Sequence, residues 1–165
     1  MRGQIWATDS ILGVAVLAFI TLLSAFIWNS AASGNSQAEK YNDLTLGAMA
    51  ASDAIVLTSG DPANWNHLPA LDEDSVAAIG LAKSRNVLDA KKLERMQALN
   101  SSNYTLFRDR MGIPLYNYSI SVLSLNGTEI WETGIAPPED AQRVRVERFA
   151  VLEKEVVKVA VEIWE

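Results

Sequence analysis

The 165-residue sequence contains no cysteine and only one histidine, His67. Without cysteine the chain has no disulfide, no thiolate-bound metal and no cysteine nucleophile. It also lacks a glycine-rich phosphate-binding loop and any paired-histidine metal motif. His67 follows Trp65 by two residues in a turn rich in proline and asparagine, which favours a structural histidine over a catalytic one. We therefore expect a protein that is not an enzyme and that uses no cofactor.

Basic residues are scarce near the N-terminus, where Arg2 is the only lysine or arginine before Lys40. Residues 11–28 contain no ionisable side chain, and a bilayer is crossed by ~20 consecutive apolar residues in a helix. Trp6 and Trp28 flank this run, as expected for indoles at the headgroup level. Because positive charge is retained in the cytoplasm, the pattern predicts a single-pass helix with a cytoplasmic N-terminus.

A secretory signal peptide is the alternative interpretation of this segment, since Ser30-Ala31-Ala32 offers small residues to a signal peptidase. The apolar run is longer than the ~7–15 residues typical of a signal peptide. We therefore expect a retained anchor over residues 1–35 and an extracytoplasmic domain over residues 36–165. The formal charge of −6 falls on that domain and argues against binding to nucleic acid.

A second helix is expected over residues 36–59. Ser36 and Glu39 have the spacing of a capping box, and Ser59-Gly60 is a typical helix C-terminus. One face is predicted to be apolar, formed by Tyr41, Leu44, Ala48, Ala51 and Ile55. Whether this helix continues the membrane span or is separate depends on Gly34, and the sequence leaves both possibilities open.

Short helices are expected between residues 72 and 112. Their predicted caps are Asp74 or Ser75 for residues 76–82, Asp89 for residues 90–99, and Ser102 for a segment that ends at Gly112. The acidic run 72–74 could also form a calcium corner. We favour a helix start, because the run lacks the alternating ligands and internal glycine of a calcium loop.

The C-terminal third alternates apolar and polar residues and predicts four strands. They cover residues 118–122, 129–133, 143–149 and 157–163, with a hairpin at Asn126-Gly127. The alternation slips at Arg148-Phe149, which predicts a bulge. We expect an α+β fold in which a four-stranded antiparallel meander packs one face against the helix at 36–59.

Four glycosylation sequons lie between residues 100 and 128, in the part expected outside the membrane. Their acceptors are Asn100, Asn103, Asn117 and Asn126. We expect N-glycans on this stretch in a host that has the machinery.

Asp9 is the one acidic residue at the start of the apolar run. It is either a solvated helix-start residue that interacts favourably with the helix dipole, or a contact inside a bundle of such helices. In a bundle its carboxylate would require a partner.

The chain resembles the type IV pilin-like proteins of archaea. The resemblance rests on the start Arg2-Gly3-Gln4 before an apolar helix and a C-terminal β domain, and on four internal segments. These segments are 59–65 (SGDPANW), 79–82 (IGLA), 86–93 (NVLDAKKL) and 104–113, which starts with Tyr104 and ends in Met111-Gly112-Ile113.

The resemblance implies a peptidase cut at Gly3-Gln4 and assembly of the freed helices into a filament core. It also implies that Asp9 corresponds to the conserved acidic residue at the start of the helix. In the family that residue is usually a glutamate at position five of the cleaved chain, whereas Asp9 would be at position six after a cut before Gln4. We expect a pilin-like subunit or accessory component of an archaeal surface filament, with like subunits and membrane lipid as partners. The alternative is a non-polymerising, membrane-anchored binding module.

Overall fold

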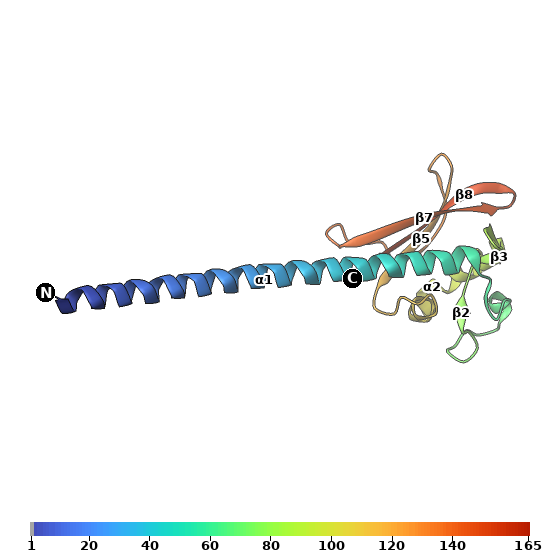
Figure 1. Cartoon of the computed structure of the whole chain (residues 1–165). Coiled ribbons are helices and arrows are strands. Elements are labelled where there is room, and N and C mark those ends of the chain that lie inside the picture. The colour runs from blue at the N-terminus through green and yellow to red at the C-terminus, as the bar shows by residue number, and fades with distance from the viewer. Residues whose placement is uncertain (1) are drawn as a thin grey trace. The chain divides into compact units, whose positions relative to one another are not determined.

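The computed structural model describes the backbone of residues 2–165, and the side chains of residues 10–30 and 38–165. Its contacts divide the chain into two units, Met1–Asn42 and Asp43–Glu165. The second unit holds the sheet and all elements after the first helix (Figure 1). The chain is therefore an α+β protein with an N-terminal apolar helix, as predicted.

Helix α1 runs without interruption over Arg2–Leu57, so no second helix starts at Ser36. The predicted capping box is therefore wrong. A single glycine inside a helix costs only ~1 kcal/mol, and the neighbouring alanines are good helix formers, so Gly34 does not end the helix. The helix ends at Leu57, and three residues later Gly60 adopts a φ of +83°, where a Cβ would lie 2.8 Å from the Ala78 carbonyl oxygen.

The C-terminal part of α1 supplies one side of the hydrophobic core. Four of the five residues predicted for its apolar face are fully buried, namely Leu44, Ala48, Ala51 and Ile55. Tyr41 is the exception and is 48% exposed. Small residues on this part of α1 allow the sheet to pack close to the helix, since a Cβ on Gly47 would lie 3.3 Å from Ile163 Cδ1.

Residues 60–88 form short strands where the sequence predicted a helix at 76–82. Strand β1 (Gly60–Asp61) pairs with β2 (Ala78–Ile79), and η1 (Trp65–His67) lies between them in sequence. Strands β3 (Ala82–Ser84) and β4 (Val87–Leu88) follow. Trp65 is fully buried and donates its indole N–H to the Gly80 carbonyl at 3.0 Å. This hydrogen bond joins η1 to the segment between β2 and β3, where the predicted helix would have been.

The acidic run at 72–74 forms a turn, so its predicted role as a helix start is also wrong. The Ser75 backbone N–H donates to Asp72 Oδ1 at 2.7 Å, and the Ser75 hydroxyl contacts the Asp72 backbone. Hydrogen bonds from the Ser75 side chain and backbone lower the pKa of the Asp72 carboxyl.

Helix α2 (Ala90–Arg110) begins at the predicted cap, because the Lys91 N–H donates to Asp89 Oδ1 at 3.0 Å. It continues through the region where two separate helices were predicted. The backbone departs from helical geometry only at Asn103, with φ −121°. The helix cap predicted at Ser102 therefore does not start a new helix, and the residue lies next to a kink within α2.

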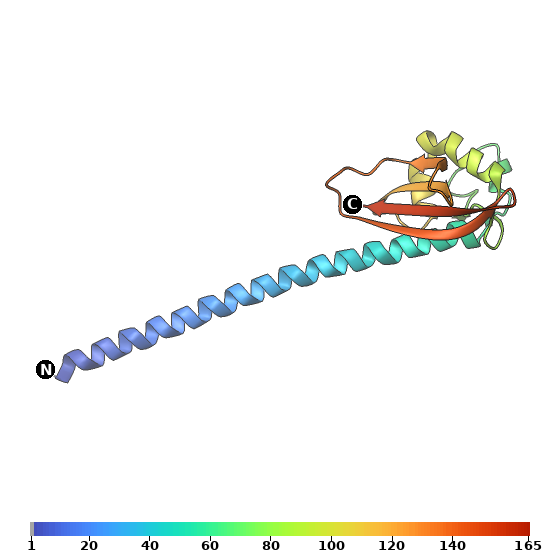
Figure 2. The same ribbon diagram turned by 90° about the horizontal axis from the view of Figure 1, so that it is seen from above.

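The main sheet has six strands and is mixed, in the order β3-β4-β7-β8-β5-β6. Its four long strands are β5 (Asn117–Ser124), β6 (Glu129–Gly134), β7 (Arg143–Leu152) and β8 (Glu155–Trp164). The four-stranded meander is wrong in two respects: β4 joins β7 in parallel, and β8 lies between β7 and β5. Figure 2 shows β7 and β8 side by side.

The central place of β8 follows from its composition. Every second residue from Val157 to Ile163 is apolar and at most 1% exposed, so this strand gains most from neighbours on both sides. The hairpin at Asn126-Gly127 is confirmed between β5 and β6, although the connection has four residues. Gly127 adopts a φ of +89° there.

No bulge occurs at Arg148-Phe149, because β7 pairs with β8 in continuous register from Arg143 to Leu152. The Arg148 side chain lies on the inner face of the sheet, and its Nε lies 2.9 Å from Asp53 Oδ1 on α1. Phe149 points to the other face and is 67% exposed. A single ion pair to α1 therefore explains the apparent slip in the hydrophobic pattern.

Candidate functional site

The main candidate site is the apolar segment Ser10–Ser30 of α1. Its 21 residues extend about 32 Å at ~1.5 Å per residue, close to the ~30 Å hydrocarbon core of a bilayer. None of the segment is buried against the rest of the chain. By length and composition it is suited to a membrane anchor, and a signal sequence has the same properties.

Apolar side chains cover the whole circumference of this segment. The large ones are between 45% and 80% exposed, and they are Ile11, Leu12, Val14, Val16, Leu17, Phe19, Ile20, Leu22, Leu23, Phe26, Ile27 and Trp28. A helix on the surface of a soluble domain would have a polar face, and this segment has none. Exposed apolar surface of this extent marks a site of contact with lipid or with other protein.

Thr21 and Gly13 are two positions of the segment without a large apolar side chain. The Thr21 hydroxyl donates to the Leu17 carbonyl at 2.8 Å, so its polar atoms are satisfied within the helix. A Cβ added to Gly13 would meet no neighbouring side chain within 4 Å, so the surface there is open to a packing partner. Helices of this kind associate in lipid through van der Waals packing at small residues and through a few polar contacts.

Three residues predicted from the sequence to act in processing and assembly lie just before this segment. Gly3, Gln4 and Asp9 belong to the helical stretch of α1. Their side chains are outside the described part of the chain, so their roles stay predictions.

The four sequons occupy different environments. Asn126 is exposed in the β5–β6 connection, whereas Asn100, Asn103 and Asn117 are half-buried. Asn100 Nδ2 donates to the Gly134 carbonyl at 3.0 Å, and Asn103 Nδ2 donates to the Leu71 carbonyl at 3.2 Å. Asn117 Oδ1 accepts from the Tyr104 hydroxyl at 3.3 Å.

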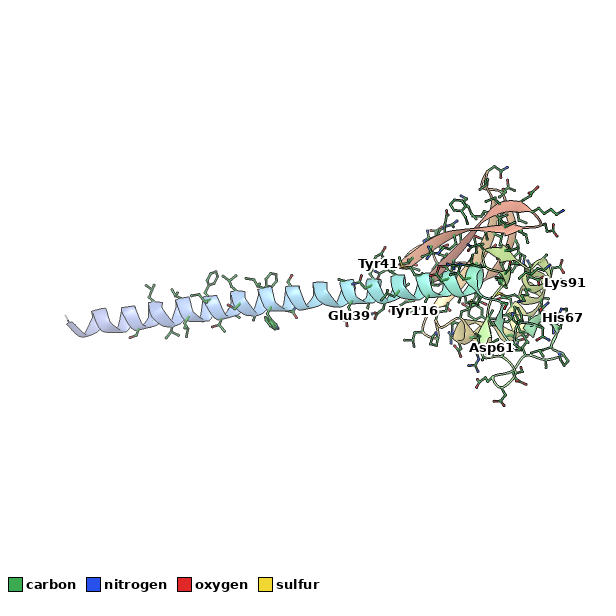
Figure 3. All side chains as sticks on the ribbon, turned by 45° about the vertical axis from the view of Figure 1, so that its right-hand side comes forward. Glu39, Tyr41, Asp61, His67, Lys91 and Tyr116 are labelled. Atoms are coloured by element: carbon green, nitrogen blue, oxygen red, sulfur yellow. The ribbon has the colours of Figure 1, made fainter. Side chains whose placement is uncertain are left out.

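His67 lies at an open depression between η1 and α2, on the same side of the domain as Lys91 (Figure 3). The depression has a volume of about 340 Å³, and its lining includes Glu94 and Arg95. His67 is exposed, in line with a histidine on the surface of a turn. Across the described side chains, no group of three or more histidine, aspartate or glutamate residues could hold a metal ion.

Lys92 is a buried residue that sequence patterns did not single out. Its Nζ donates to the Ser59 carbonyl at 2.6 Å and to the Ala82 carbonyl at 3.2 Å. Burial lowers the pKa of Lys92, and the charge of Asp89 opposes that shift. The ammonium therefore links α2 to the end of α1 and to β3, and its role is structural.

Two stacked tyrosines connect α2 to β5. The rings of Tyr104 and Tyr118 are parallel with centroids 4.7 Å apart, and the Tyr118 hydroxyl donates to Asn100 Oδ1 at 3.1 Å. Burial raises the pKa of both hydroxyls, so both are neutral and act as hydrogen-bonding groups at physiological pH.

Comparison with known proteins adds no relative. No protein-family model matches the chain, and no curated protein or solved structure matches it.

Proposed function

We propose that the protein is a pilin-like subunit or accessory component of an archaeal cell-surface filament, and that it assembles through its N-terminal apolar helix. The observation that carries the proposal is the apolar surface of α1 over Ser10–Ser30, none of which is buried. Such a surface requires lipid before assembly, and in a filament the helices of neighbouring subunits can take the place of lipid.

The continuity of α1 supports this mechanism. The helix that carries the apolar segment also supplies Leu44, Ala48 and Ile55 to the domain core. The assembling segment and these core residues therefore belong to one continuous helix in the sequence. In the proposed filament the apolar segments bundle in the interior and the acidic domains face outward.

A catalytic role forms no part of the proposal. His67 is exposed, Lys92 is used to join three elements, and both core tyrosines are neutral. The lysine and the tyrosines form hydrogen bonds with structural partners, and no neighbouring group among the described side chains is placed to activate His67 as an acid or a base.

A non-polymerising, membrane-anchored binding module is the second candidate. Leu125 and Val156 favour it, because they are 62% and 49% exposed and line an open depression at the hairpin end of the sheet. Exposed apolar side chains in a depression are typical of a surface that binds a partner. Both candidates place the domain outside the cell.

Protease added to intact cells tests this topology. We expect digestion of the domain from residue 36 onward and protection of the segment Ser10–Ser30, because lipid shields it. Mass spectrometry of the cell-bound fragments provides the measurement, with a cytoplasmic protein as the control for cell integrity. Full protection of Lys91 in intact cells, with cleavage there after lysis, would place the domain in the cytoplasm and contradict both candidates.

A further inference from the structure

We infer that Asn126 is the one residue among the four sequons that is N-glycosylated in the folded protein. The inference rests on the proposed extracytoplasmic location of the domain. It selects a single acceptor where the sequence offers four. The selection comes from exposure, hydrogen bonding and space around each asparagine.

The hairpin connection between β5 and β6 holds the Asn126 side chain in a defined geometry. Asn126 Oδ1 accepts from the Thr128 backbone N–H at 3.1 Å, so the side chain folds over its own sequon as an Asx turn. The Ser124 hydroxyl also donates to Asn126 Oδ1. These contacts hold the amide oxygen in place and bring Asn126 and Thr128 to one side of the turn. Nδ2 has no acceptor among the described residues.

The surface around Asn126 leaves room for a glycan. Asn126 and Thr128 are exposed, and Gly127 between them has no neighbouring atom where a Cβ would lie. Asn126 itself lines the depression beside Leu125, whose volume is about 440 Å³. A glycan is bulky and needs an acceptor on an open surface loop. The β5–β6 connection provides one.

The other sequons have their amides or hydroxyls in use. Asn100 and Asn103 lie on α2, and both Nδ2 atoms donate to backbone carbonyls of other segments. Asn117 lies in β5 opposite Trp164, and its sequon partner Ser119 is only 7% exposed. Glycosylation at any of these three would require local unfolding of α2 or β5.

The proposed reaction is a transfer from a lipid-phosphate-linked oligosaccharide. Asn126 Nδ2 attacks the anomeric carbon of the first sugar, and the bond between that carbon and the phosphate oxygen breaks. The lipid phosphate leaves with the bonding electron pair, and the amide nitrogen loses one proton. A membrane-bound glycosyltransferase of the host supplies the donor and the catalyst.

The test uses the full chain from its native cells. Intact mass and peptide mapping are measured for the unaltered protein, Asn126→Gln, Thr128→Ala and Thr128→Ser. We expect one glycan in the unaltered protein and in Thr128→Ser, which keeps the sequon hydroxyl. We expect complete loss of that glycan in Asn126→Gln and Thr128→Ala. Ser102→Ala and Thr105→Ala remove the α2 sequons at exposed positions and should leave the mass of the glycan unchanged.

Surface labelling of the same cells separates this inference from the proposed function. A surface-labelled domain with an unmodified Asn126, or with glycans on Asn100, Asn103 or Asn117, would overturn the inference and leave the proposed location intact. An unlabelled domain would overturn both. A labelled domain with a glycan on Asn126 alone supports both.

Discussion

Val159→Asn should reduce the free energy of unfolding of the domain by about 2.5–6 kcal/mol, a large fraction of the ~5–15 kcal/mol that stabilises an ordinary domain. Val159 is fully buried on β8, between Val122 of β5 and Arg148 of β7. Removing the buried side chain costs about 1.5–3 kcal/mol, and an amide without a partner adds about 1–3 kcal/mol. Urea denaturation of the full chain in detergent, followed by tryptophan fluorescence, measures the change.

Lys158→Asn provides a matched control at the preceding residue of the same strand. Lys158 lies on the opposite face, with its side chain 27% exposed and its Nζ 3.8 Å from Glu147 Oε2. A partly exposed ion pair of this length contributes about 0–1 kcal/mol. The two variants should therefore differ by several kcal/mol. Equal losses of stability would mean that the assigned inner face of β8 is wrong.

Asp9→Ala should abolish filaments on cells while the domain stays folded and displayed. In the proposed helix bundle the Asp9 carboxylate is surrounded by apolar helices and must pair with a cation or an amine of a neighbouring subunit. Removing one partner leaves the other charge buried and unpaired, which costs about 3–5 kcal/mol in each contact. That loss recurs at every subunit, so assembly should stop. Electron microscopy of intact cells measures filaments, and surface labelling measures display.

Asp9→Glu is the control for this experiment, since it keeps the negative charge and should preserve filaments. If the protein is only anchored, Asp9 is a solvated residue at a helix start, and its loss costs about 1 kcal/mol or less. Filaments that persist in Asp9→Ala would refute the assembly role of this residue. Absence of filaments in the unaltered protein would favour the anchored module.

The apolar helix and the general fold class could be predicted because they depend on long, local patterns. Residues 11–28 have no ionisable side chain, and the alternation from Val157 to Ile163 is regular. Asp89 and Gly127 were also recognisable, because a helix cap and a glycine at positive φ each require particular residue types.

The strand order could not be predicted, because it depends on contacts between distant segments. Strand β8 lies between β7 and β5, whereas the predicted meander would place β6 beside β7. No residue pattern within either hairpin specifies which strand of one hairpin pairs with the other hairpin. The parallel pair of Val87 with Val151 was missed for the same reason. The tight turn between β7 and β8 has Glu153 and Lys154 at positive φ, without the asparagine or glycine that would have indicated it.

The site was predicted less completely than the fold. The apolar segment was evident, whereas the environments of the four sequons depend on how α2 packs beside β6. Asn100 reaches the Gly134 carbonyl across 34 residues of sequence, and no local pattern indicates such a contact. Lys92 was missed because a lysine within a charged helical segment gives no sign that it will be buried.

The mass of the N-terminus in protein from native cells tests the proposed assembly most directly. Assembly into a filament requires that the subunit leave the bilayer, so a peptidase should cut between Gly3 and Gln4. We expect a mature chain that begins at Gln4, measured by mass spectrometry of the N-terminal peptide. A chain that still contains Arg2 and Gly3 would contradict the proposed subunit and support the retained anchor, and a chain that begins after Ala32 would show that the apolar segment is a signal peptide.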